Sequence, residues 1–257
     1  MIRSLQCDLR VNTGYKSGAQ IARVVTEHWC SLNLYCAGCD SESLVQTPPN
    51  TKAIDFHCAH CQQTYQLKSQ RHTNLTRVTD GSYTSMLAAV QLNRAPNLLI
   101  LNYGREWTIQ QLLLIPSVFF TESVLERRPP LNQHARRAGW VGCNFLLSNV
   151  PEDGKIPLVL ENEVVPPYLV RKSFQQQQNF KNIEWHARGW TLDVLRIART
   201  LGRSFKLHDV YQHESDLMRL HPANRNVRAK IRQQLQVLRD LGHLDFLGNG
   251  NYRFKHY

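Results

Sequence analysis

Four cysteines form two Cys-x-x-Cys pairs, Cys36 with Cys39 and Cys58 with Cys61, and 18 residues separate the pairs. A tight Cys-x-x-Cys turn lets two thiolates converge on one ion, and this spacing is typical of a four-cysteine zinc site. Four thiolates complete the tetrahedral shell of zinc, so no position is left for a reactive water and the ion is structural. A redox role is the alternative, although it needs only one pair. We therefore predict structural zinc.

A second group of candidate residues flanks the second cysteine pair. Residues 53–58 and 64–69 have the pattern of two short strands, which would form a hairpin with the cysteine pair at its tip. Period-2 alternation places Gln66 and Lys68 on one face, with Asp55 able to lie opposite them. This arrangement resembles the skeleton of the PD-(D/E)XK nucleases, in which the first two residues hold Mg²⁺ and the lysine engages the attacking water. The bare pattern also arises by chance in unrelated proteins.

The elements that must position these residues alternate between helix and strand. Apolar spacing from Ile21 to Trp29 predicts a helix near residues 18–31 that Ser17 caps, and Asp80 is expected to cap a second helix that begins near Tyr83. Further strands are expected at 97–103, near 107–116 and near 155–164. The N-terminal part is therefore expected to be a mixed α/β domain covering residues 1–180.

The composition shifts at Ser173–Lys181, where four consecutive glutamines interrupt the hydrophobic pattern, and we place a linker there. Residues 181–257 then contain three helical patterns, starting near Thr191, Leu207 and Arg225. A turn at 248–251 joins two strand-like segments at the end of the chain. Three helices closed by a hairpin predict a winged-helix domain over residues 181–257.

The third of these helices has the features of a DNA-reading helix. Val227, Ile231, Leu235 and Leu238 form its buried stripe, which leaves basic and amide side chains facing outward. Such side chains supply the donors and acceptors that base edges require, although an ordinary solvated face has similar residues. The DNA-contacting candidates on this helix are Arg225, Arg228, Arg232, Gln233 and Gln236.

Charge and composition narrow the class of partner. The net charge of +11, of which +7 belongs to residues 181–257, favours a polyanion such as DNA. The apolar stretches are of strand length, so no membrane association is expected. With no secretion signal and with thiols spaced for metal, we expect an intracellular, cytoplasmic protein of a prokaryote that acts as a monomer. Cys7, Cys30 and Cys143 are expected to be ordinary buried thiols.

Sequence blocks along nearly the whole chain resemble the Dpn-type methyl-directed restriction endonucleases. The matching blocks include the two cysteine pairs, Asp55 and Leu67–Ser69. The other matching blocks are Tyr15–Ser17, Ala22–Arg23, Asp80–Gly81, Ala135–Asn144, Arg188–Thr191, Glu214–Leu217 and Ile231–Gln236. The resemblance implies a PD-(D/E)XK nuclease domain with an inserted zinc site, joined to a winged helix. It further implies that both domains read GATC sites carrying N6-methyladenine and that double-strand cleavage depends on Mg²⁺.

The resemblance also assigns residues. Asp55 and Gln66 would hold Mg²⁺ with the Leu67 carbonyl, and Lys68 would position or deprotonate the water. The family pattern has Glu where this chain has Gln66, and the amide removes one negative charge from the metal site. An active Gln-x-Lys variant and an inactivated site are both consistent with this residue.

Arg136, Arg137 and Trp140 would contact phosphate and bases, with the indole against the methyl group; surface charge and a core indole are the alternative. We therefore expect a type II endonuclease acting on adenine-methylated double-stranded DNA. The rival expectation is a non-catalytic regulator that binds DNA through a zinc module and a winged helix.

Overall fold

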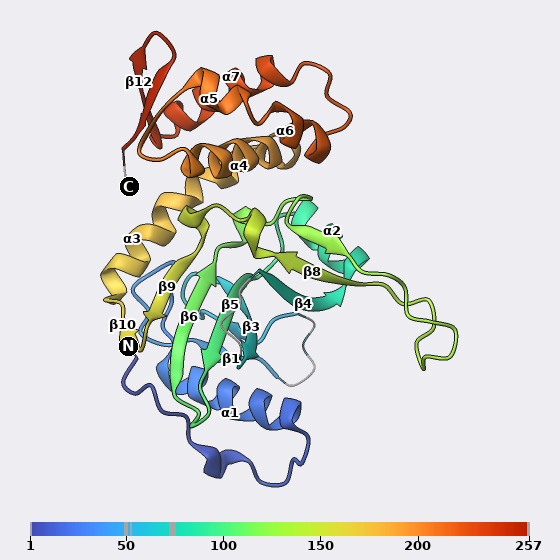
Figure 1. Cartoon of the computed structure of the whole chain (residues 1–257). Helices are drawn as coiled ribbons and strands as arrows, with labels where there is room; N and C mark the ends of the chain where they lie inside the picture. Colours follow the sequence, from blue (N-terminus) through green and yellow to red (C-terminus); the bar gives the residue numbers. More distant parts are fainter. Residues whose placement is uncertain (1, 49–50, 52, 72–75, 256–257) are drawn as a thin grey trace.

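The computed structural model describes residues 2–48, 51, 53–71 and 76–255, and Figure 1 shows their arrangement. Within these residues a seven-stranded sheet forms the centre of the N-terminal part. Neighbouring strands are antiparallel except β3 and β5, which are parallel. In spatial order the strands are β1 (Val45–Gln46), β2 (Phe56–His57), β3 (Thr64–Gln70), β5 (Asn97–Tyr103), β6 (Ile109–Ile115), β9 (Ile156–Leu160) and β10 (Glu163–Val164).

Strand β5 is buried on both faces because two hydrophobic cores sandwich the sheet. Leu99 and Leu101 pack into the core that contains Val25 and Trp29 of helix α1 (Gly18–Asn33). Leu98 and Ile100 point to the opposite face and into the second core. The strand and the helix were both predicted, the strand from its run of apolar residues and the helix from the helical spacing of its apolar residues.

A second sheet lies against that opposite face and consists of β4 (Arg77–Ser82), β8 (Gly142–Leu146) and β7 (Leu125–Arg127), in this order. Helix α2 (Tyr83–Gln91) follows β4, and its N-cap is Ser82, whose hydroxyl accepts from the amide of Ser85. The expectation that Asp80 caps this helix was wrong. Asp80 lies within β4 opposite Cys143, and its carboxylate is used by two side chains of β3 instead.

Residues 128–141 connect β7 to β8 and form a long loop, here called the arm. The arm projects from the body of the protein in Figure 1, where it is the lime-green loop beyond β8. Its two strands of chain are tied near the base, where Arg128 N–H donates to the Gly142 carbonyl, and further out, where Leu131 N–H donates to the Trp140 carbonyl. The arm is therefore an extension of the second sheet.

The segment predicted as a linker, Ser173–Lys181, is helical. It forms the second half of α3 (Pro167–Gln177) and most of the following 3-10 turn η5 (Gln178–Asn182). Val170, Phe174 and Gln177 share one buried face of α3, and glutamine has a favourable helix propensity. The run of glutamines therefore changes the composition without ending the helix.

The C-terminal part contains the three predicted helices and, among the described residues, an additional helix, α6 (Glu214–Leu220). The first helix begins at Trp185, six residues before the expected start, because Trp185 and Arg188 are also buried. Asn249 and Gly250 both have positive φ, as a two-residue hairpin turn requires. The elements are α4 (Trp185–Thr200), β11 (Ser204–Lys206), α5 (Leu207–Tyr211), α6 (Glu214–Leu220), α7 (Val227–Asp240), β12 (Leu244–Gly248) and β13 (Asn251–Phe254). The last two residues of the predicted final strand lie outside the described residues.

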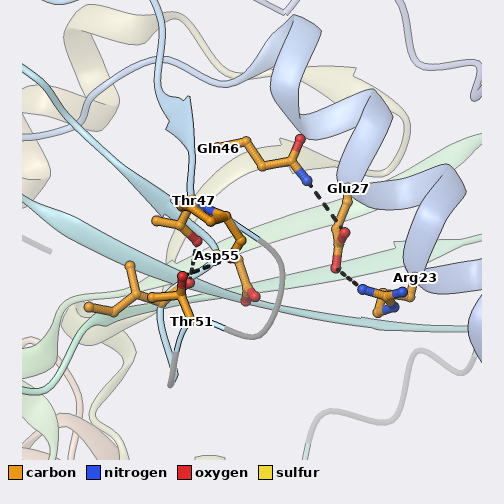
Figure 2. A pocket seen from close by; sticks show the side chains of 8 residues that line it. Arg23, Glu27, Gln46, Thr47, Thr51 and Asp55 are labelled. Atoms are coloured by element: carbon orange, nitrogen blue, oxygen red, sulfur yellow. Dashed lines mark hydrogen bonds and ion pairs between the residues drawn. The ribbon is translucent and has the colours of Figure 1, made fainter.

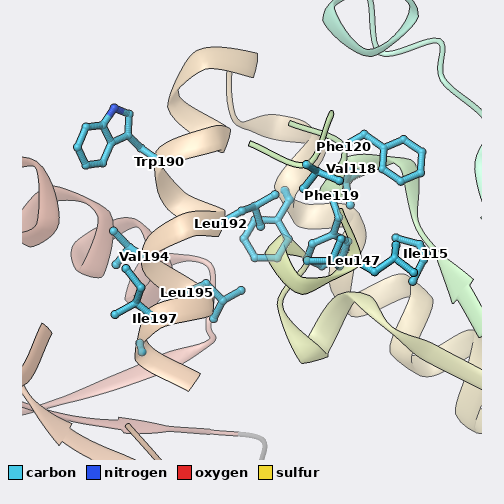
Figure 3. Close-up of a cluster of buried hydrophobic side chains, with 14 of the residues drawn as sticks. Ile115, Val118, Phe119, Phe120, Leu147, Trp190, Leu192, Val194, Leu195 and Ile197 are labelled. Atoms are coloured by element: carbon cyan, nitrogen blue, oxygen red, sulfur yellow. The ribbon is translucent and has the colours of Figure 1, made fainter. Parts of the chain in front are cut away.

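The two parts of the chain share one hydrophobic core. Leu192 and Leu195 of α4 belong to the same cluster as Phe119 and Leu147, which come from 3-10 turns in the N-terminal part (Figure 3). Arg199 of α4 adds an ion pair with Asp153 that is largely buried. The short 3-10 turns are η1 (Leu9–Val11), η2 (Ser117–Phe119), η3 (Leu147–Asn149) and η4 (Glu152–Gly154).

Candidate functional site

The four cysteines predicted to bind zinc lie together at the tip of the β2–β3 hairpin. Their Sγ atoms are all within 4.8 Å of one another, and the closest pairs are Cys36 with Cys61 at 3.4 Å and Cys39 with Cys58 at 3.6 Å. Tetrahedral zinc with Zn–S bonds of about 2.3 Å needs sulfur atoms about 3.8 Å apart. The cluster is therefore compatible with one zinc ion. Cys7, Cys30 and Cys143 are buried elsewhere, as expected.

Polar groups lower the pKa of one thiol of the cluster, Cys58, whereas burial raises the pKa of Cys36 and of Cys61. Burial acts to raise the pKa of the Cys58 thiol, but the main-chain N–H groups of Cys61 and His60 act against it and lower that pKa to about 6. Tyr65 places its hydroxyl 3.3 Å from the Cys36 sulfur. Arg171 of α3 donates to the Cys36 carbonyl, so the helix after the sheet braces the first cysteine pair. Strand β3 and helix α3 therefore both support the cysteine cluster.

Asp55 lies where β2 stops pairing with β3. The last register pair is Phe56 with Tyr65, and one step further the N–H of Leu67 donates to Asp55 Oδ2 at 2.7 Å. The N–H and the carbonyl of one strand residue point to the same side, so the Leu67 carbonyl also faces this open edge. Burial raises the pKa of Asp55 above its ordinary value, while the Leu67 hydrogen bond and Lys68 act to lower it.

Gln66 and Lys68 share one face of β3, as period-2 alternation predicted, and both contact Asp80. The Lys68 Nζ atom lies 2.6 Å from Asp80 Oδ1, and Gln66 Nε2 donates to the same oxygen at 2.9 Å. Gln66 and Asp80 are buried, whereas Lys68 keeps about a quarter of its side chain exposed. Gln66 and Lys68 therefore meet at Asp80, and Asp55 contacts β3 at Leu67, the residue between them.

A small pocket adjoins Asp55 on the side of α1 (Figure 2). Arg23 and Glu27 of that helix form an ion pair at 3.7 Å on its wall, and Gln46 Nε2 donates to Glu27. Burial raises the pKa of Glu27, and the charge of Asp55 raises it further, while Arg23 lowers it. The positively charged guanidinium of Arg23 therefore lines the same pocket as the carboxylates of Glu27 and Asp55.

These residues fit a hard divalent cation such as Mg²⁺. The Asp55 carboxylate, the Leu67 carbonyl and an amide oxygen of Gln66 are all oxygen donors, which Mg²⁺ prefers. Gln66 presents its nitrogen to Asp80, so its Oε1 atom is left for another partner. The donor set has the right chemistry.

The arm carries the residues predicted for the nuclease-side DNA contact. Arg136 and Arg137 are exposed, and Trp140 is half-buried, with the Arg137 guanidinium 5.0 Å from the centre of its ring. The indole also covers Gly142, where a Cβ would lie 2.9 Å from the ring. Trp140 is therefore a surface aromatic at the arm base rather than a core indole.

Helix α7 has the buried stripe that the sequence predicted, with Gln234 as an additional buried residue that accepts from the Thr191 hydroxyl. Three of the outward residues already have partners: Arg228 pairs with Glu214, Arg232 donates to the Tyr211 hydroxyl, and Gln233 accepts from Gln234 Nε2 at 3.4 Å. All five predicted DNA-contacting side chains of this region are exposed, namely Arg225, Arg228, Arg232, Gln233 and Gln236.

Sequence reasoning missed the place of Asp80, Arg23 and Glu27 in the site. Asp80 had been interpreted as a helix cap, although the Asp80–Gly81 block was among those matching the Dpn-type enzymes. Arg23 likewise lies in a matched block, Ala22–Arg23. These matches were the available signal, because no local pattern links these residues to β3.

A comparison against protein families matches nearly the whole chain. The model of the Dam-replacing family, DpnI, matches residues 3–183, and the Dam-replacing HTH domain matches residues 186–254. The chain belongs to the Dam-replacing family. The resemblance seen in the sequence is confirmed, and the family is one of restriction endonucleases, so a nuclease with a helix-turn-helix domain is supported. No helix in the described part of this family member is long and apolar enough to cross a lipid bilayer.

Proposed function

We propose that this Dam-replacing family member is a type II endonuclease that cleaves double-stranded DNA at GATC sites carrying N6-methyladenine. The observation that carries the proposal is that Gln66 and Lys68 of β3 meet at Asp80, while Asp55 accepts from the N–H of Leu67 between them, at the edge of the strand. A non-catalytic regulator has no need for a lysine and a carboxylate at an unpaired strand edge. The PD-(D/E)XK fold, residues 1–180 as the nuclease domain and residues 181–257 as a winged helix are parts of the same proposal.

Mg²⁺ bound by Asp55, Gln66 Oε1 and the Leu67 carbonyl would supply a positive charge that stabilises the phosphate as negative charge develops on it. Lys68, which Asp80 holds as the ammonium, positions the attacking water and stabilises the hydroxide that forms as the water loses a proton to solvent. The water oxygen bonds to phosphorus as the P–O3′ bond breaks, which leaves a 5′-phosphate and a 3′-hydroxyl. Asp55 also holds the edge of β3 through its hydrogen bond with the N–H of Leu67. The next residue, Lys68, therefore lies on a fixed part of the strand.

Two surfaces would read the DNA. The arm supplies Arg136, Arg137 and Trp140, Arg225 lies two residues before α7, and α7 supplies Arg228, Arg232, Gln233 and Gln236. Exposed Arg and Gln side chains on a helix of a helix-turn-helix domain are suited to contact guanine and adenine edges in the major groove. An aromatic face at the arm base is suited to a methyl group. Recognition is therefore proposed to be shared between the two domains.

The test is cleavage of a fully adenine-methylated plasmid in the presence of Mg²⁺, with Lys68→Ala as the key variant. We expect discrete fragments from the wild type, no fragments from unmethylated plasmid, and at least a hundredfold slower cutting by Lys68→Ala. Binding of Lys68→Ala to methylated DNA should stay within about threefold of wild type, because no reading surface changes. Binding without any cutting by the wild type would favour the regulator instead.

A further inference from the structure

Asp80 is a buried carboxylate that joins two residues of the site from a different sheet. Its side chain is 3% exposed, and its Oδ1 atom contacts both Lys68 Nζ and Gln66 Nε2. We propose that Asp80 is a positioning residue, which fixes Lys68 and Gln66 for phosphodiester hydrolysis and links their position to the arm. This inference rests on the endonuclease function proposed above.

The first effect of Asp80 is on the orientation of Gln66. A carboxylate only accepts hydrogen bonds, so the amide must present its nitrogen to Asp80 and its carbonyl oxygen away from it. Without this contact the two ends of the amide could exchange places by rotation. Asp80 thus selects the oxygen of Gln66 as the group available to a cation, in a chain where this position lacks a carboxylate of its own.

The second effect is on Lys68. Lysine carries a charge at the end of a flexible four-carbon chain, and an ion pair in a partly buried setting restricts it to one position. The 2.6 Å contact with Asp80 holds the ammonium on the same side of β3 as Gln66. Asp80 also adds a negative charge near Asp55, whose pKa it raises. Asp80 of β4 therefore supplies part of the negative charge that Gln66, a neutral amide, does not provide.

The third observation is where Asp80 stands. It pairs with Cys143 of β8, and Ser82 pairs with Gly142, with an irregularity in register between them. Gly142 is the residue on which the Trp140 ring packs and the point where the arm enters β8. Because β3 and β4 belong to separate sheets among the described residues, a shift of the arm base would move Asp80 relative to Lys68. Docking of the arm on DNA and placement of Lys68 are therefore mechanically connected.

A second carboxylate of the same sheet provides a matched control. Glu126 of β7 pairs with Arg77 at 2.9 Å and accepts from Asn144 Nδ2 at 2.6 Å, so all of its contacts stay within the sheet. Neither of these two interactions of Glu126 involves a residue of β3. Glu126→Gln therefore makes the same chemical change as Asp80→Asn, without touching Lys68 or Gln66.

The first measurement is the single-turnover rate of cleavage of a methylated duplex by excess enzyme with Mg²⁺. Asp80→Asn should cut about 10- to 100-fold more slowly, the range found for groups that orient catalytic residues through hydrogen bonds. Its affinity for the same duplex without divalent cation should stay within twofold of wild type, and Glu126→Gln should match wild type in both. A folded Asp80→Asn protein that cuts at the wild-type rate overturns the proposal.

The second measurement needs no metal or substrate and compares the unfolding midpoints of Lys68→Met, Asp80→Asn and the double variant. If Asp80 acts through Lys68, the double variant should be at least as stable as the less stable single variant, because no unpaired buried charge remains. Additive losses would show that Asp80 and Lys68 do not act on each other and would overturn the proposal. Failure of the wild type to cut would instead refute the endonuclease function, while this coupling would still be measured.

Discussion

The main-chain N–H of Leu67 donates to Asp55 Oδ2 at 2.7 Å, beyond the last register pair of β2 with β3. A side-chain carboxylate thus takes the place that the next residue of a longer β2 would occupy. The consequence is a carboxylate held at a partly buried strand edge, where burial raises its pKa above the ordinary value. Such a group is suited to binding a cation and is unfavourable in the absence of one.

The raised pKa of Asp55 predicts that this residue reduces the stability of the metal-free protein. A carboxyl with a higher pKa in the folded state binds its proton more tightly there, so its stabilising contribution is present below the unfolded pKa and is lost as pH rises through the folded pKa. Asp55→Asn should therefore raise the unfolding midpoint at neutral pH, by about 2–4 °C for each kcal/mol relieved. The gain should vanish at acid pH. A midpoint lower than wild type at pH 7 in metal-free buffer would contradict this.

Removal of zinc is predicted to unfold the N-terminal domain. Structural thiolate sites contribute on the order of 10 kcal/mol to folding, which is comparable to the whole stability of a domain. Chelation or Cys58→Ser should abolish the cooperative unfolding transition measured by circular dichroism. Cys7→Ala, which removes a buried thiol outside the cluster, should retain one zinc per chain by elemental analysis. A chelated protein with an unchanged midpoint would show that the cluster is not structural.

Trp140 is predicted to contribute to selection of the methyl group. Burial of one methyl is worth about 0.8 kcal/mol, or roughly fourfold, while each tenfold preference needs about 1.4 kcal/mol. Trp140→Ala should narrow the ratio of cleavage rates for methylated and unmethylated sites by about fourfold or more, and hemimethylated sites should be cut at an intermediate rate. His134→Ala, an exposed change on the same arm, should leave the ratio unchanged. Full selectivity in Trp140→Ala, with equal cutting of hemimethylated sites, would argue against shared recognition.

Gln233 on α7 is predicted to discriminate between bases. One bidentate contact is worth about 1–3 kcal/mol of discrimination, so Gln233→Ala should reduce the preference for methylated GATC duplexes about 5- to 100-fold in binding assays. Arg239→Ala on the same helix is the control, because Arg239 pairs with Asp240 near the C-terminal end. The full chain should be used, since Leu192 and Leu195 of α4 are buried in the core shared with the N-terminal part. Equal losses of affinity for methylated and unmethylated DNA would show that Gln233 of α7 contributes to DNA binding but not to discrimination between the two.

The sequence predicted those elements whose residues carry a local period or a local spacing. The all-buried strand β5, the stripe of α7, the Asn249–Gly250 turn and the cysteine cluster follow from such patterns. The hairpin was predictable as well, because Asp55 and Lys68 flank the cysteines closely in sequence. Local rules were sufficient for all of these.

Long-range pairing explains what the sequence could not predict. Asp80 has the residue type and position of a helix cap, and only the ladder between β4 and β8 turns it toward Lys68. The glutamines of α3 have the composition of a linker, and only the contacts of Val170 and Phe174 with the core that contains Trp29 show why the helix continues. Both errors arose because tertiary contacts overrode a local signal.

The position of the cysteine cluster along the chain has a consequence for synthesis on the ribosome. All four cysteines precede β5, the strand beside which β3 must pair. Metal uptake can therefore occur while β5, β6 and the whole helix-turn-helix domain are still untranslated, as N-terminal units of a growing chain fold first. A nascent chain that has captured zinc already holds Asp55 opposite β3. The metal supply of the cell would then act at the moment of translation, and later addition of zinc to chains completed without it would have to compete with aggregation.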